Sequence, residues 1–132
     1  MTSQVFLSFK ETDREYIDNL VAKIDDPENH NLKFEYKPLV NRWDTVDMTV
    51  IRREVISRLE ETSRTIVLLG EETHRSFWVP IEVEQSLKRG SRVFAIRLEG
   101  QFGKTPTFLT DNGIKLHSWS EARLQKLATE PL

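Results

Sequence analysis

Short apolar runs alternate along the chain with segments in which apolar residues recur at helical spacing. The runs at residues 4–9, 65–69 and 93–98 are mostly apolar, which is typical of strands buried on both faces of a parallel sheet. Run 65–69 is the richest in β-branched residues, so we expect it to be the central strand. Residues 32–36 alternate apolar and polar, which indicates a half-exposed strand near a sheet edge, and residues 114–116 indicate a weak last strand.

The segments between these runs predict four helices. Apolar spacings of i, i+4 and i+7 indicate helices at about residues 13–24, 48–59, 77–89 and 121–127. We expect Thr12 or Asp13 to cap the first helix and Ser120 to cap the last. Gly90 is expected to end the third, because glycine readily adopts the backbone conformation that terminates helices.

The order of these elements predicts a single doubly wound α/β domain. Strands that alternate with helices give a mostly parallel sheet with right-handed crossovers and helices on both faces. No repeat, low-complexity tract or linker divides the chain, so we expect residues 1–132 to form one domain. The longest irregular stretch, residues 37–47, is the kind of loop on which binding residues gather.

Composition narrows the class of protein. The 132 residues include no cysteine, which excludes a disulfide framework and a thiolate site. A net charge of −2 gives no reason to expect nucleic acid or an acidic membrane as a partner. No apolar stretch approaches the roughly 18 residues of a membrane span. The N-terminus lacks the features of a signal peptide, so a soluble cytoplasmic protein is expected.

Several familiar sites are missing from the predicted loops. The first strand is not followed by G-x-G-x-x-G, and neither a P-loop nor G-x-S-x-G occurs. His30, His74 and His117 stand at no metal-ligand spacing. A phosphoacceptor receiver domain would carry aspartate after the central strand, where this chain has Gly70.

The stretch at residues 76–83 follows the central strand and opens the third helix. In open α/β sheets ligands bind at the carboxyl ends of the strands, where such loops converge. Trp78 and Glu82 could hold a small molecule there between an aromatic face and a charge.

Helical periodicity alone does not decide which glutamate of this helix faces a site. Glu82 and Glu84 each lie about 100° from the centre of the expected buried face, which comprises Val79, Val83 and Leu87. The periodicity is equally consistent with two solvated glutamates, with Glu84 and Lys88 forming an i,i+4 ion pair.

Two motifs on the expected elements resemble the TIR domains. Residues 5–13, Val-Phe-Leu-Ser-Phe-Lys-Glu-Thr-Asp, are similar to the family's first strand and loop. Ser76, Trp78 and Glu82 match the S-x-W-x-x-x-E-[LV] spacing that carries the catalytic glutamate in NAD-consuming members. Residues 70–74, Gly-Glu-Glu-Thr-His, resemble more closely the bacterial TIR-like branch that includes the Thoeris anti-phage TIR proteins.

This resemblance, which extends over about residues 5–119, implies a flavodoxin-like fold. In active members it also implies cleavage of the nicotinamide–ribose bond of NAD. The product is ADP-ribose, or a cyclised or conjugated form that acts as a second messenger in anti-phage defence. NAD is then a substrate and no cofactor is implied. The implied partners are other copies of the domain and a phage-derived activator.

By the same resemblance Glu82 is the catalytic residue. Nicotinamide is a cationic leaving group that departs neutral, so no general acid is required. The developing oxocarbenium ion and the ribose hydroxyls instead need one negative group. The resemblance implies that the substrate is bound after the first strand, in the long loop and above the helix, by Phe6, Ser8, Phe9, Lys10, Trp43, Asp44 and Trp78.

Two departures from the family pattern leave an alternative open. The first loop reads Glu11-Thr12-Asp13 in place of a Gly-Glu-Asp-type sequence, and Pro80 stands before the glutamate. Some TIR domains are adaptors that assemble with like domains and have no activity. Glu82 together with Trp78 favours the enzyme.

Overall fold

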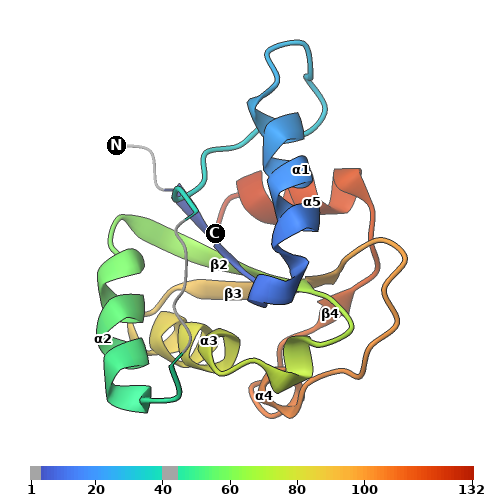
Figure 1. Ribbon diagram of the computed structural model, residues 1–132. Coiled ribbons are helices and arrows are strands. Elements are labelled where there is room, and N and C mark those ends of the chain that lie inside the picture. Colours follow the sequence, from blue (N-terminus) through green and yellow to red (C-terminus); the bar gives the residue numbers. More distant parts are fainter. Residues whose placement is uncertain (1–3, 40–44) are drawn as a thin grey trace.

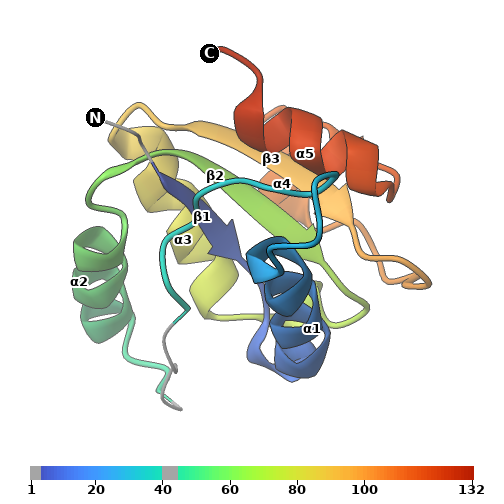
Figure 2. The same cartoon turned by 90° about the horizontal axis from the view of Figure 1, so that it is seen from above.

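The computed structural model describes residues 4–39 and 45–132. Its centre is a parallel sheet, and helices cover both faces of that sheet (Figures 1 and 2). The strands are all parallel and follow their sequence order across the sheet: β1 (Gln4–Ser8), β2 (Thr62–Leu69), β3 (Arg92–Arg97) and β4 (Leu116–His117). The predicted doubly wound α/β fold is confirmed.

The helices divide between the two faces of the sheet, as Figure 1 shows. One face carries α1 (Arg14–Asp25) and α5 (Glu121–Thr129), and the other carries α2 (Met48–Arg58), α3 (Trp78–Lys88) and the single turn α4 (Thr107–Thr110). Short 3-10 turns precede α1 and α3 at Glu11–Asp13 and Thr73–Arg75.

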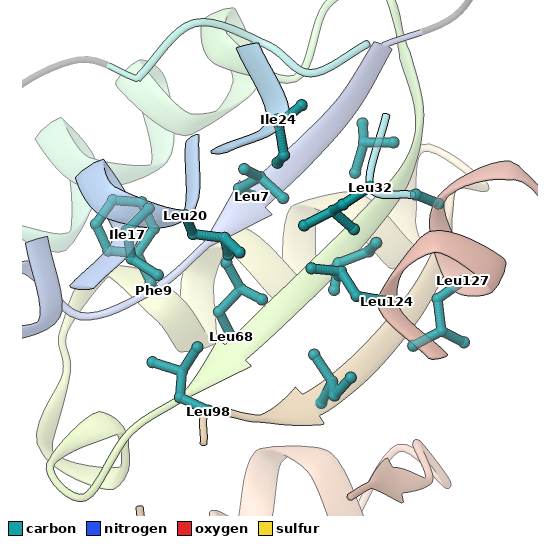
Figure 3. Close-up of a cluster of buried hydrophobic side chains, with 14 residues drawn as sticks. Leu7, Phe9, Ile17, Leu20, Ile24, Leu32, Leu68, Leu98, Leu124 and Leu127 are labelled. Atoms are coloured by element: carbon teal, nitrogen blue, oxygen red, sulfur yellow. The ribbon is translucent and has the colours of Figure 1, made fainter. Parts of the chain in front are cut away.

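The face beneath α1 and α5 is packed with aliphatic side chains (Figure 3). Successive strand residues point to opposite faces, so Leu7 and Leu68 face this side while their neighbours face the other. They meet the apolar stripe of α1, formed by Ile17, Leu20 and Ile24. Full burial of one such side chain contributes about 1.5–3 kcal/mol, so this core fixes the sheet in place.

The opposite face packs β1, β2 and β3 against α2 and α3. Phe6 lies in a cluster with α2 and the first turns of α3, while Val67 and Leu69 pack against Val79 and Val83. Helix α3 is covered by the sheet and by α2, so its buried residues extend well beyond one stripe: Trp78, Val79, Ile81, Glu82, Val83, Gln85 and Ser86.

The predicted edge strand at residues 32–36 is reduced to a single parallel bridge between Val5 and Tyr36. The amide of Val5 donates to the carbonyl of Glu35 at 2.9 Å, and the amide of Lys37 donates to the carbonyl of Val5 at 2.8 Å. Pro38 then fixes φ near −65°, away from the value near −120° of a parallel strand, and the regular pairing stops. The bridge places this segment outside β1, so the order across the sheet is flavodoxin-like.

Two helix ends agree with the sequence. The hydroxyl of Ser120 accepts from the amide of Arg123 at 2.9 Å, as expected of an N-cap. Gly90 follows α3 with φ of 83°, the left-handed conformation that favours glycine.

Three local predictions were wrong. Asp13 precedes α1, but neither it nor Thr12 caps that helix through its side chain. Leu87 is 39% exposed rather than buried, because the sheet and α2 cover the other sides of α3. The last strand begins at Leu116, because Ile114 instead closes the turn after α4 with a bond to the carbonyl of Leu109.

Candidate functional site

The carboxyl end of β1 lies where the direction of the chain across the sheet reverses. From β1 the chain first crosses to the outer segment at Tyr36, and then returns by α2 to β2 on the other side. In doubly wound sheets ligands bind at such a switch point, at the carboxyl ends of the two strands. Ser8 and Leu69 end the two strands here.

Glu82 lies in the interior at this corner. Its exposed fraction is 0%, and its Oε1 accepts a hydrogen bond from the Ser8 hydroxyl at 2.7 Å. Glu84 has a different environment, since its Oε1 lies 3.5 Å from Arg52 and 3.4 Å from Lys88 at the outer surface. The structure therefore separates the two glutamates that the helical wheel left equivalent, and the predicted pair of Glu84 with Lys88 is confirmed.

A line of polar groups continues from Glu82 under α3. The Ser86 hydroxyl donates to the Glu82 carbonyl at 2.6 Å, and it lies 2.7 Å from the Thr65 hydroxyl of β2. All of these residues are buried. Burial of polar groups is tolerated when they bond to one another, and such networks fix geometry. The corresponding signal in the sequence is a polar residue among apolar neighbours, Thr65 in β2 and Ser86 in α3.

Trp78 forms an aromatic wall one helical turn before Glu82. Its side chain is 7% exposed and packs with Phe6 and Ile81. The guanidinium carbon of Arg58, at the end of α2, lies 5.0 Å from the centre of the Trp78 ring. Trp78 thus lies four residues before Glu82 on α3 with a cation on its face, and its expected role at the site stays a prediction.

The other candidate residues lie apart from this group or outside the described part of the chain. Phe9 belongs to the core on the opposite face of the sheet, with Arg14 5.3 Å from its ring centre. Lys10 follows it, half-buried. Trp43 and Asp44 lie outside the described residues, so their predicted roles stay predictions.

A small cavity lies at the outer edge of β1, beyond the bridge at Val5. We call it the edge cavity. Its volume is about 70 Å³, and its walls are formed by Phe6, Leu7, Phe9, Lys37, Pro38, Leu39 and Arg58. It brings Phe6 and Phe9 together, although they belong to different cores.

The family model for the TIR-like domain of the Thoeris protein ThsB matches residues 6–102, well over half of the chain. The chain belongs to this family. The match runs from β1 through β3 and includes Ser8, Trp78 and Glu82. No curated protein matches the chain. Family membership makes this a defence-related TIR module.

The TIR-like domain also brings Asp13 against the end of β2. A methyl group at Gly70 would overlap the Asp13 carboxylate, which explains why glycine stands at this position. Oδ2 of Asp13 is buried without a hydrogen-bond partner. Burial raises the pKa of Asp13 above its ordinary value; nearby Glu71 and Glu72 add to the rise, while Lys10 opposes it.

Within residues 4–39 and 45–132 of the TIR-like domain, no three His, Cys, Asp or Glu side chains are grouped so as to hold a metal ion. The pKa of His117 is lowered by burial and by the nearby Lys115 and Arg123. None of the helices in these same ranges is long and apolar enough to cross a membrane.

Proposed function

We propose that this TIR-like domain cleaves the nicotinamide–ribose bond of NAD, with Glu82 as the catalytic carboxylate. One observation carries the proposal: a fully buried glutamate meets the Ser8 hydroxyl at 2.7 Å at the switch point of the sheet. Burying a carboxylate is costly, and apolar residues of similar volume would often be as stable there. The position of this carboxylate, one helical turn from Trp78 and at the carboxyl ends of parallel strands where ligands bind, supports a chemical role.

In the proposed reaction the bond between C1′ of the ribose and the nicotinamide nitrogen breaks. The bonding electrons leave with nicotinamide, which departs neutral. Glu82 stabilises the positive charge that develops on the ribose and accepts from its hydroxyls, while Ser8 orients the carboxylate. Water then adds to C1′ and releases a proton, giving ADP-ribose. An internal nucleophile would instead give a cyclic product.

The remaining binding roles follow from the family resemblance. Trp78 would pack beneath the substrate, with Phe6, Phe9 and Lys10 near the end of β1. Trp43 and Asp44 would contact the substrate from the loop after residue 39. The product would act as a second messenger in cytoplasmic anti-phage defence.

A substrate can reach Glu82 only if the conformation of the resting protein changes, because the Glu82 side chain has no exposed surface. We expect assembly with other copies, or a phage-derived activator, to open this corner. Activity per molecule should therefore rise with protein concentration or with the activator.

The test is direct incubation of the purified protein with NAD over a wide range of protein concentrations. Nicotinamide, ADP-ribose and cyclic or conjugated products are followed by chromatography, with and without a lysate of phage-infected cells. We expect nicotinamide release that becomes more efficient at high concentration or with the lysate. No release under any of these conditions would reject the enzyme.

The alternative function is a non-catalytic adaptor that assembles with like domains. It is favoured by exposed apolar side chains on α2 and α3: Ile56, which lines a shallow hollow, is 53% exposed, and Leu87 is 39% exposed. Ligand-dependent melting separates the two functions. At a hundredfold excess of NAD over Kd an enzyme gains about 2.7 kcal/mol of stability, whereas an adaptor shows no rise.

A further inference from the structure

The edge cavity combines an apolar lining with two cations. Five of its seven lining residues are apolar, and the other two are Lys37 and Arg58. No carboxylate is among these seven residues. An apolar-lined cavity with positive charge on its wall favours an anionic group over a neutral one.

The size of the cavity restricts what it can take. A cavity needs about 10–15 Å³ of accessible volume to hold one water, so about 70 Å³ has room for several waters or for one compact group. A phosphoryl group is compact enough to enter.

Arg58 is held in the wall of this cavity by its neighbours. Its side chain is only 14% exposed, its guanidinium lies over the Trp78 ring, and its Nε is 3.6 Å from Glu54. The donors of a guanidinium lie in the plane of the group, which suits bidentate recognition of phosphate. Lys37 is held from the other side, where its Nζ donates to the Glu60 carbonyl at 2.9 Å.

The position of Arg58 relates the cavity to the buried carboxylate. Trp78 carries Arg58 on its face and lies one turn of α3 before Glu82. Residues four apart are neighbours on one side of a helix, so Trp78 connects the cation in the cavity wall with the buried carboxylate.

We propose that the edge cavity binds a phosphoryl group of the dinucleotide, with Arg58 as the main anion contact and Lys37 as the second. This inference rests on the proposed function. Arg58 is a positioning residue: it fixes the diphosphate so that the nicotinamide ribose lies at Glu82.

The experiment compares Arg58→Gln with Arg52→Gln, an arginine of the same helix that pairs with Glu84 at the outer surface. ADP-ribose and adenosine are titrated into each folded variant by calorimetry, since neither ligand needs turnover. We expect ADP-ribose to bind at least tenfold more weakly to Arg58→Gln than to wild type, while Arg52→Gln and adenosine binding change little. In turnover, KM for NAD should rise more than kcat falls.

A second pair of variants keeps the test decisive if Arg58→Gln does not fold. Arg58→Lys retains the charge without the planar fork, and Lys37→Gln removes the other cation; both should weaken ADP-ribose binding. Unchanged ADP-ribose binding in these folded variants, or none by wild type at millimolar ligand, would overturn the inference. Nicotinamide release with an unaltered KM in Arg58→Gln would reject the phosphoryl site alone. Arg58-dependent binding without nicotinamide release would instead reject the proposed reaction.

Discussion

The two faces of the sheet are built differently. Beneath α1 and α5 the buried side chains are hydrocarbon, and Figure 3 shows them as one continuous cluster that includes Leu7, Leu68 and Leu124. Beneath α2 and α3 the apolar packing is interrupted by buried polar groups, with Glu82 and Ser8 at its centre. Both faces belong to the same strands, so the difference lies in alternate residues of one backbone.

This difference assigns stability of the domain mainly to the first face and the proposed activity to the second. Hydrocarbon burial is non-directional and contributes in proportion to area. A buried carboxylate contributes little net stability but fixes a charge in a defined place. Substitutions on the first face should therefore change stability, and substitutions on the second should change activity.

Leu68→Ala should give the largest effect on stability. Leu68 is fully buried, and removing its side chain loses both transfer free energy and packing around the resulting cavity. We expect the free energy of unfolding to fall by about 2–5 kcal/mol, measured by chemical denaturation. Nicotinamide release per folded molecule should change by less than about twofold, since ~0.4 kcal/mol corresponds to that factor. A tenfold loss of release in fully folded protein would show that the two faces are not separable.

Ser8→Ala should have an intermediate effect on stability and a larger one on activity. It removes the donor to the Glu82 carboxylate, and hydrogen bonds to charged groups contribute about 1.5–3 kcal/mol. We expect nicotinamide release to fall about tenfold, equivalent to ~1.4 kcal/mol in the barrier. Ser57→Ala, at an exposed position of α2, serves as the control and should alter neither the stability nor the nicotinamide release. If Ser8→Ala released nicotinamide as fast as wild type does, Ser8 would have no role in the proposed reaction.

Asp13→Asn should give the smallest effect, a gain in stability. Burial raises the folded pKa of Asp13 above 3.8, so the folded state binds the proton more tightly than the unfolded state does. Stability is therefore lost as the pH rises from about 3.8 through the raised pKa, and asparagine avoids this loss. At pH 7 we expect a gain of less than about 1 kcal/mol, because the half-buried group keeps part of its hydration.

The gain should disappear in melting curves recorded below pH 4. A variant less stable than wild type at pH 7 would indicate that the Asp13 carboxylate is needed where it lies, against Gly70.

Much of the fold could be predicted because strands and helices impose different periods on the apolar residues. Strand β2 begins at Thr62, three residues before the predicted start. Its first three residues, Thr62, Ser63 and Arg64, are polar and therefore carry no apolar signal. Leu87 was misplaced because a wheel centred on one stripe cannot show that α2 covers a second side of α3.

The candidate site was less predictable. The order of elements indicated this corner, but only the resemblance to a family selected Glu82 over Glu84. The Ser8–Glu82 bond joins residues 74 positions apart, and the stacking of Arg58 on Trp78 depends on how two helices pack. Neither contact leaves a periodic signal in the sequence.

The most direct test of the polar corner compares Glu82→Gln with Glu84→Gln, measuring nicotinamide release and melting temperature on the same samples. Both substitutions remove one negative charge from α3, but only Glu82 meets Ser8 in the interior. We expect Glu82→Gln to lose release by about a thousandfold, the scale of one preorganised electrostatic contact, with a nearly unchanged melting temperature. Glu84→Gln should release nicotinamide as wild type does. Wild-type release in Glu82→Gln, or its loss in Glu84→Gln alone, would contradict the assignment of the carboxylate.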